Sequence, residues 1–448
     1  MSKILILISF LITFTSQVHG SIELASRLYD GGKYYAAYTM LKKSINKNTR
    51  NEAKSLAYKL IDRIHPAVFK NDSDLNRLFD KSTPLNYAVA IRAFYLGDLR
   101  STEKFLYHIK KDHPSNMEVN YLRGMIYYIK NDFNASARSF KKCYIAANKK
   151  SRNTLKTDDY IHAFSNRCIQ QLSRIFFEKK NYRASLKYLR KVKKTDFVWP
   201  RLLFDKAWNY YWLNKYPQTL GTLVSYKASY LKKFMLPEAN YLRALTYYDL
   251  CYYKKAERIY DEFLGGIYKE KKLFQSMTTR ELKKIIFKRK SSKQKSSDRF
   301  IISLLKGYRK DTKFFSFRSA MTRLKSETKL MKKYKSNEFK KIVLELKKYQ
   351  AYVRLDFDNF LLSLTRDYYK QIERTNKKFL RLKLGLGIRR QKNIIKKSQT
   401  TFKDDFVDLD LSQIDNLDEK FIWEFKGGFW ADELGDYAVA LRSQCSEA

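Results

Sequence analysis

The chain has 448 residues and a formal net charge of +46, and aromatic residues make up 15% of it. Fourteen Gly and six Pro are few for this length, which favours an all-α protein over one built from many short strands. The charge favours anionic partners, and four Cys without a CxxC spacing argue against a zinc site.

The first 20 residues have the pattern of a secretory signal. Lys3 supplies a short positive region, and residues 4–14 form an apolar run that is too short to span a membrane. Val18 and Gly20 suit the positions before a cleavage site, so we expect cleavage after Gly20. The mature chain is then exported and periplasmic, either free or peripheral to a membrane, and export makes nucleic acid an unfavoured partner despite the charge.

A helical hairpin is predicted at residues 237–263. Apolar residues recur there at steps of three and four on both sides of a break at residues 249–252, and Pro237 suits the first turn of a helix. The same pattern recurs upstream, at residues 22–45, 87–109, 119–144, 168–192 and 200–226, with a weaker match at 51–82. The chain therefore predicts an array of hairpins that bury their apolar faces on one another.

The copies can be placed in register on the first large residue of each second helix. These residues are Tyr34, Leu99, Phe133, Tyr182, Tyr216 and Tyr253. Two of the spacings are 34 residues, the period of tetratricopeptide repeats. Small residues recur within the first helices (Ala25, Ala90, Gly124, Ser173, Ala207, Ala244) and within the second helices (Ala37, Thr102, Ser136, Ser185, Thr219, Ala256).

At these residues the stretch 22–263 resembles the tetratricopeptide repeat family. Three features depart from the family pattern: the first-helix Trp is absent, the terminal Pro occurs only as Pro114, and Ser or Thr often replaces Ala. The resemblance implies a right-handed solenoid over residues 21–268, whose concave groove is lined by the first helix of each hairpin and binds another protein.

Transfer of the family pattern assigns ten residues to this partner-binding groove. They are Tyr121, Tyr128, Arg174, Arg201, Phe204, Trp208, Tyr211, Trp212, Tyr241 and Tyr248. Aromatic and Arg side chains are the usual energetic anchors of protein interfaces. The alternative for any one of these rings is a core position between adjacent helices.

Residues 269–400 are predicted to form a basic helical region, with 40 Lys and Arg against 11 Asp and Glu. A flexible Lys/Ser loop is expected near 283–298, and patterns at 339–352 and 357–384 predict a long antiparallel helix pair. The candidate anion-binding residues are Lys283, Lys284, Lys288, Arg289, Lys290, Lys293 and Lys295. Their ligand would be a lipid headgroup, a glycan or nucleic acid, and the alternative is a solvated lysine-rich face.

Residues 401–448 are first acidic and then aromatic. Seven acids lie within 404–419 and could either lie on the basic helices or bind a partner, and residues 430–442 predict a short amphipathic capping helix. The string FWADELGDY at 429–437 resembles the end of exported tetratricopeptide proteins of predatory and gliding bacteria, including a gliding-motility component. That resemblance implies an assembly of the cell envelope.

The four cysteines allow three disulfide pairings. Cys143–Cys168 would join neighbouring helices and Cys251–Cys445 would tie the tail to the array, whereas four buried thiols remain the alternative.

No catalytic motif is found in the sequence: there is no GxSxG, GxxxxGK[ST] or HExxH. Gly385 and Gly387 follow a helical pattern rather than a strand, and His108 and His113 are poorly spaced for a metal. We therefore expect no enzyme, metal or cofactor. The sequence predicts an exported scaffold for protein–protein interaction in a bacterial envelope complex, linked to motility. The alternative is an anionic-surface binder that acts through residues 269–400.

Overall fold

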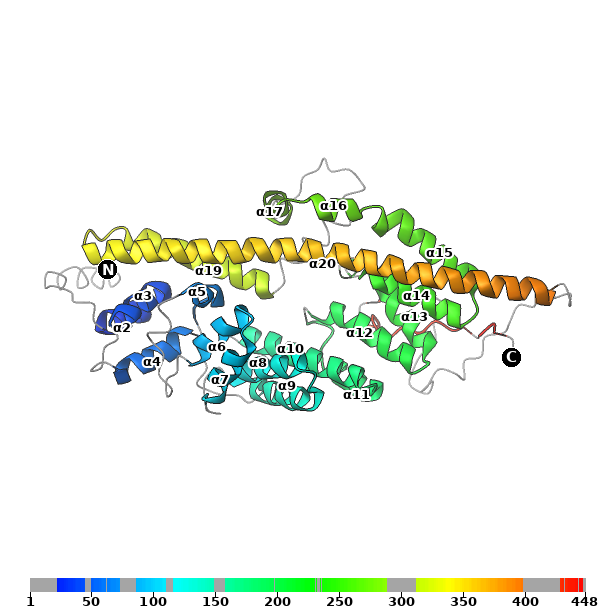
Figure 1. Ribbon diagram of the computed structural model, residues 1–448, viewed down its shortest axis with the longest axis horizontal. Coiled ribbons are helices and arrows are strands. Elements are labelled where there is room, and N and C mark those ends of the chain that lie inside the picture. Colours follow the sequence, from blue (N-terminus) through cyan, green and yellow to red (C-terminus); the bar gives the residue numbers. More distant parts are fainter. Residues whose placement is uncertain are drawn as a thin grey trace. The chain divides into compact units, whose positions relative to one another are not determined.

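The protein is all-α, as the composition predicts (Figure 1). The computed structural model describes residues 22–44, 50–61, 63–72, 86–109, 116–148, 158–196, 198–229, 231, 234, 236–287, 312–397, 428–430, 432–441 and 443–445. The signal segment 1–20 and the acidic stretch 404–419 lie outside them. Within the described part, no helix is both long and apolar enough to cross a bilayer.

The chain divides into two compact units. Unit 1 comprises residues 1–165 and 312–358, and unit 2 comprises residues 166–311 and 359–448. This grouping differs from the division at residues 268 and 400 that the sequence predicts. The reason is that helix α20 (Asn337–Lys397) is shared: its first part belongs to unit 1 and the rest to unit 2.

The remaining helices follow in chain order. Unit 1 holds α2 (Ile22–Asp30), α3 (Tyr34–Ser44), α4 (Arg50–Ile61), α5 (Pro66–Lys70), α6 (Asn86–Tyr95), α7 (Leu99–Tyr107), α8 (Asn116–Ile129), α9 (Phe133–Asn148) and α19 (Thr312–Met331). Helix α10 (Asp158–Glu178) crosses the unit boundary. Unit 2 holds α11 (Tyr182–Leu189), α12 (Trp199–Trp212), α13 (Tyr216–Val224), η2 (Ser225–Lys227), α14 (Pro237–Asp249), α15 (Tyr253–Phe263), the π-helix η4 (Leu264–Tyr268), α16 (Lys271–Ser276) and α17 (Thr279–Phe287).

One turn recurs in the six predicted hairpins. The residue two positions before each second helix is left-handed, with φ between 58° and 79°; these residues are Gly32, Gly97, Asn131, Lys180, Asn214 and Cys251. The next backbone N–H reaches back into the first helix, as in Asp98 N to Ala93 O at 2.9 Å and Tyr252 N to Tyr247 O at 2.8 Å. This is the Schellman arrangement that ends a helix. It confirms the register on Tyr34, Leu99, Phe133, Tyr182, Tyr216 and Tyr253.

The small residues of the pattern lie where the two helices of a hairpin meet. The Ser136 hydroxyl donates to the Gly124 carbonyl at 2.8 Å, and the hydroxyls of Ser173 and Ser185 are hydrogen-bonded at 2.8 Å. A Cβ atom on Gly124 would lie 2.7 Å from the Phe140 ring. Ser therefore replaces Ala in these copies without leaving a buried hydroxyl unpaired.

The predicted antiparallel pair at 339–352 and 357–384 is wrong, because both stretches belong to the single helix α20 (Figure 1). Residues 337–384 contain no Gly or Pro, and buried Val353, Phe357 and Leu361 continue the apolar spacing across the expected break.

The predicted loop at 283–298 also begins too early. Lys283 and Lys284 lie in α17. The start of this helix is fixed by a capping box, in which the Thr278 N–H donates to the Glu281 carboxylate at 2.8 Å and the Glu281 N–H donates to Thr278 Oγ1 at 3.3 Å. Residues 288–298 lie outside the described residues.

The capping helix predicted at 430–442 is wrong as well. The described residues there form a turn at 432–436, followed by chain without regular secondary structure. Gly435 has φ of +86°, which an α-helix does not allow, and Leu434 is fully buried. We call the described residues between 428 and 445 the C-terminal strap.

Candidate binding surfaces

An aromatic cluster covers one side of helix α12 in unit 2. We call it the α12 aromatic face, and it consists of Tyr182, Phe204, Trp208, Tyr211 and Trp212. The Trp212 ring is stacked with Tyr182 at 6.0 Å between centroids and with Trp208 at 6.5 Å. Phe204 is buried and Trp208 is half-buried, whereas 52% of Trp212 is exposed. Packed rings thus support one large exposed ring.

A hydrogen bond fixes Tyr211 on this face. Its hydroxyl donates to Asp249 at 2.5 Å. Burial, followed by the bond to Asp249, raises the pKa of Tyr211, so the phenol stays neutral and remains a donor. Tyr211 therefore joins the end of α12 to the end of α14, and its main role is positional.

The two predicted groove arginines lie beside the α12 aromatic face. Arg174 Nε lies 3.4 Å from the Asp205 carboxylate, and Gln170 donates to the same carboxylate at 3.4 Å. Arg174 is exposed and Arg201 is half-buried. Lys180 and Arg183, next to Tyr182 in the chain, are also exposed. The edge of the face is consequently basic.

The two groove residues of the sixth hairpin are covered by the chain's own helix α20 (Figure 1). Phe379 packs edge-on against Tyr241 and also contacts Tyr260 and Phe263, with centroids 5.0–5.6 Å apart. A Cβ atom on Gly385 would lie 2.9 Å from the Tyr248 hydroxyl. The prediction that Tyr241 and Tyr248 line an open partner groove is therefore wrong, because α20 occupies that side of α14.

Of the two groove residues predicted in unit 1, one packs between helices and the other is exposed. Tyr121 is half-buried and packs edge-on against Phe140 and Phe164, so part of its ring is used in packing between helices. Tyr128 is exposed and packs against Phe133. The same helix α8 borders a cavity of about 280 Å³, where the Arg123 guanidinium already donates to the Leu106 carbonyl at 2.5 Å.

The C-terminal strap runs along α12 and α13 within unit 2. Lys206 donates to the Gly435 carbonyl at 2.8 Å and pairs with Asp436 at 2.7 Å. The Gly435 N–H donates to Ser225 Oγ at 2.8 Å, and the Val439 N–H donates to the Pro217 carbonyl at 3.0 Å. At about 100° per residue, Lys206 lies on the side of α12 away from Trp208. The strap therefore leaves the α12 aromatic face uncovered.

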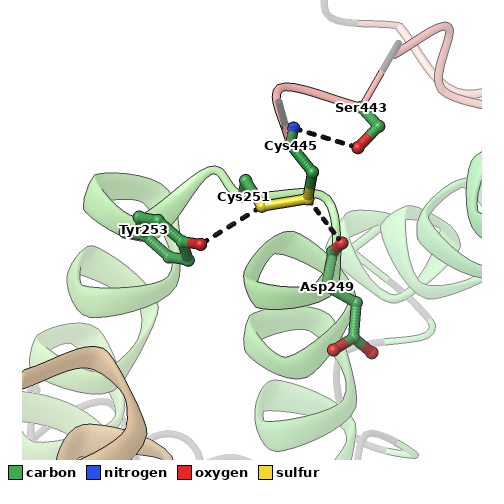
Figure 2. The surroundings of a disulfide bond; sticks show 5 residues. All are labelled: Asp249, Cys251, Tyr253, Ser443 and Cys445. Atoms are coloured by element: carbon green, nitrogen blue, oxygen red, sulfur yellow. Dashed lines mark hydrogen bonds between the residues drawn. A yellow bond between two sulfur atoms is a disulfide. The ribbon is translucent and has the colours of Figure 1, made fainter. Parts of the chain in front are cut away.

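A disulfide between Cys251 and Cys445 ends the strap (Figure 2). The Cys445 sulfur lies 3.2 Å from the Asp249 carbonyl, and the Tyr253 hydroxyl donates to Cys251 Sγ at 3.2 Å. The sequence left three pairings open, and the structure has the one that contains Cys251–Cys445. Cys143 and Cys168 are disulfide-bonded as well, so the alternative of four buried thiols is wrong.

The packing of the C-terminal strap on α12 and α13 was not predicted from the sequence. A Cβ atom on Gly221 would lie 1.8 Å from the Tyr437 carbonyl oxygen, and one on Gly435 would lie 2.7–2.8 Å from Leu203 and Trp199. Glycine is needed at 221 because the backbone of the strap approaches α13 so closely. It is needed at 435 because φ is +86° and a Cβ atom would meet the side chains of Leu203 and Trp199. A Gly inside the pattern of α13 was the available signal, since such a Gly often marks a packing requirement.

The predicted anion-binding residues are not gathered in the described structure. Lys283 is half-buried and Lys284 is exposed, both on α17, and the other five (Lys288, Arg289, Lys290, Lys293, Lys295) lie outside the described residues. Exposed basic residues with described positions gather instead along α20, which includes Lys370, Arg374, Lys377, Arg381 and Lys383.

Within the described residues, no group of three or more His, Cys, Asp or Glu is placed to hold a metal ion. His108 is exposed at the end of α7, and His113 lies outside the described residues.

No protein-family model and no curated protein sequence matches the chain. Solved structures that are similar to it include two Rap proteins. The apo form of RapI has 12% identity and a TM-score of 0.38, and covers 80% of this chain and 97% of its own. A Rap protein complexed with Competence and Sporulation Factor has 12% identity and a TM-score of 0.32, and covers 78% and 98%. At these scores the similarity carries no argument about function.

Proposed function

We propose that this chain is a non-catalytic scaffold of the tetratricopeptide type, and that it holds another protein on the α12 aromatic face. The observation that carries the proposal is Trp212, a large ring that is half-exposed yet supported by Tyr182 and Trp208. Trp and Tyr that are held rigidly at a surface are characteristic of the residues that dominate protein interfaces.

The mechanism is preorganisation of the surface. Tyr211 is fixed by Asp249, and Trp212 is stacked on Tyr182 and Trp208, so these side chains need little further ordering when a partner binds. Arg174, Lys180 and Arg183 make the surroundings basic. We therefore expect the partner to insert an apolar side chain beside Trp212 and to present acidic residues around it.

We further propose that the chain is exported and acts in the bacterial envelope, in an assembly linked to gliding motility. The signal pattern at residues 1–20 and the FWADELGDY string support this proposal. Two disulfide-bonded cysteine pairs are compatible with an oxidising compartment. Fractionation of the native host, with N-terminal sequencing of the mature chain, tests the location and the cleavage after Gly20.

The test of partner binding is a single substitution, Trp212→Ala. Tagged wild-type and variant chains are crosslinked in their own envelope, purified, and compared by mass spectrometry. Loss of a central aromatic anchor costs about 2 kcal/mol or more, which is roughly a 30-fold loss of affinity, so the partner should vanish from the variant sample. Trp208 and Tyr211 are poorer choices, because they are half-buried and their removal would also disturb α12 and α14.

Trp430→Ala is the matched control. Trp430 is 70% exposed on the C-terminal strap, so the same side chain is removed from a different surface of unit 2. The strap variant should retain the partner. Equal recovery of the partner by wild type and Trp212→Ala would show that the α12 aromatic face is not the binding surface.

A further inference from the structure

Near the end of its described side chains, helix α20 carries apolar residues on two opposite sides. Phe379, Leu382 and Leu386 are buried on the side that faces α14 and α15. Leu380, Leu384 and Ile388 are exposed by 46%, 71% and 58%. Residues four apart lie on one side of a helix, so these three form a continuous stripe, which we call the outer stripe.

Basic residues line the outer stripe. At about 100° per residue, Lys377 and Arg381 lie along one edge and Lys383 along the other. All three are exposed. Residues 374–388 contain five Lys and Arg and no Asp or Glu. The nearest acid in the chain, Glu373, is paired with Lys271 at 2.7 Å, and Lys378 is paired with Glu238 of α14.

We propose that the outer stripe docks this protein on the surface of an anionic phospholipid bilayer. The occupant follows from the charge and shape of the site. An apolar stripe with basic edges on the outside of a helix fits the surface of a bilayer. Leu and Ile would enter the boundary between headgroups and acyl chains, while Lys and Arg contact the lipid phosphates. A basic protein partner is disfavoured, because it would meet the exposed Lys377, Arg381 and Lys383 along both edges of the stripe.

This surface differs from the Lys/Ser stretch that the sequence suggests for anion binding. Charge alone identified residues 283–295, whereas the outer stripe combines charge with exposed apolar side chains. Only the combination gives binding that partly survives salt, because the apolar contribution is not screened.

The experiment is sedimentation of the full mature chain with vesicles. Vesicles of phosphatidylcholine with about 30% phosphatidylglycerol are compared with vesicles of phosphatidylcholine alone. The wild type should sediment with the anionic vesicles only. The triple variant Leu380→Ser, Leu384→Ser and Ile388→Ser should bind at least about tenfold more weakly, because the apolar contribution is lost.

A second variant reverses the charge of the edges: Lys377→Glu, Arg381→Glu and Lys383→Glu. It should also lose binding to the anionic vesicles. The control removes two other exposed leucines of α20, Leu344 and Leu355, by substitution with Ser. Acids at 345, 356 and 358 lie close to them in the chain, so the control should bind as the wild type does.

Three outcomes would overturn the proposal. The first is equal binding of the wild type to neutral and anionic vesicles, and the second is unchanged binding by the triple variant. The third is no vesicle binding by the wild type, which is the result expected if the stripe binds an acidic protein segment. A dimer that becomes a monomer in the triple variant, measured by light scattering, would identify a self-interface instead. Trp212→Ala should bind vesicles normally, so this result is independent of the proposed function.

Discussion

In unit 1 the long helices meet the repeat hairpins through buried polar groups in addition to rings, such as Tyr349 against Tyr38. In unit 2 the buried contact is mainly aromatic. Glu327 of α19 accepts a hydrogen bond from the Ala36 N–H at 2.9 Å, near the start of α3. Tyr349 of α20 lies over Lys42, whose ammonium group pairs with Asp72 at 2.7 Å. In unit 2 the centre of the contact is Phe379.

The burial of the ion pairs differs as well. The side chains of Lys42 and Asp72 are 9% and 2% exposed, whereas those of Lys378 and Glu238 in unit 2 are 41% and 32% exposed. Buried charges depend strongly on their partners and on pH, and exposed ones contribute little. Unit 1 should therefore respond to pH and to loss of charge, and unit 2 to loss of apolar volume.

The largest expected effect in unit 2 is that of Phe379→Ala. The ring is buried among Tyr241, Tyr260 and Phe263, so its removal leaves a cavity and should lower the free energy of unfolding of unit 2 by about 3–5 kcal/mol. Chemical denaturation measures the loss, and hydrogen exchange should show faster exchange in α14 and α15. Leu380→Ala, at the exposed neighbouring position, should change stability by less than about 0.5 kcal/mol. Equal effects of the two variants would contradict packing of α20 on α14.

The second effect concerns the strap. Replacement of both Cys251 and Cys445 by Ser removes the covalent tie and should cost about 2–4 kcal/mol. The strap keeps its contacts with Lys206, Ser225 and Pro217, so we expect partial release, seen as increased proteolysis after residue 428. A variant as resistant and as stable as the wild type would show that the strap is held by its hydrogen bonds and ion pairs alone.

The third effect tests the polar contact of unit 1. Burial raises the pKa of Glu327 from 4.5 to about 7. The N–H groups of Ala36 and Tyr35 and the charges of Lys33 and Arg323 act in the opposite direction, but their effect is smaller. The folded-state pKa is the higher one, so the contribution of Glu327 to stability is fully present below pH 4.5 and lost as the pH rises through about 7. The loss amounts to about 3 kcal/mol.

Glu327→Gln should remove this part of the pH dependence. The amide oxygen can still accept the Ala36 N–H, and no charge is buried at any pH. Denaturation at a series of pH values from about 4 to 8 should show a falling stability for the wild type and a flatter profile for the variant. Parallel profiles would mean that another group controls the titration.

The repeat hairpins could be predicted because local rules determine them. Gly32 and Gly97 mark turns by composition. Lys180 and Cys251 take the same positive φ at the equivalent positions of their copies, although their residue types do not indicate it. The packing of α20 could not be predicted, because Phe379 and Leu380 are equally apolar neighbours and only tertiary contact decides which one is buried. For the same reason Tyr241 could not be distinguished from Trp212: both fit the groove pattern, but only Tyr241 is covered by α20.

The smallest expected effect is that of Lys378→Met. Lys378 pairs with Glu238 and lies 5.6 Å from the centre of the Tyr241 ring, but both partners of the ion pair are partly exposed. An exposed pair contributes at most about 1 kcal/mol, and the methionine retains the apolar stem, so the free energy of unfolding should change by less than that.

The comparison variant in unit 1 is Lys42→Met. It leaves Asp72 buried without its ammonium partner and should cost about 3–5 kcal/mol. Denaturation of both variants at low and high salt measures the difference. Comparable losses in the two variants would mean that the contact in unit 2 is also electrostatic, and that Phe379 is not its centre.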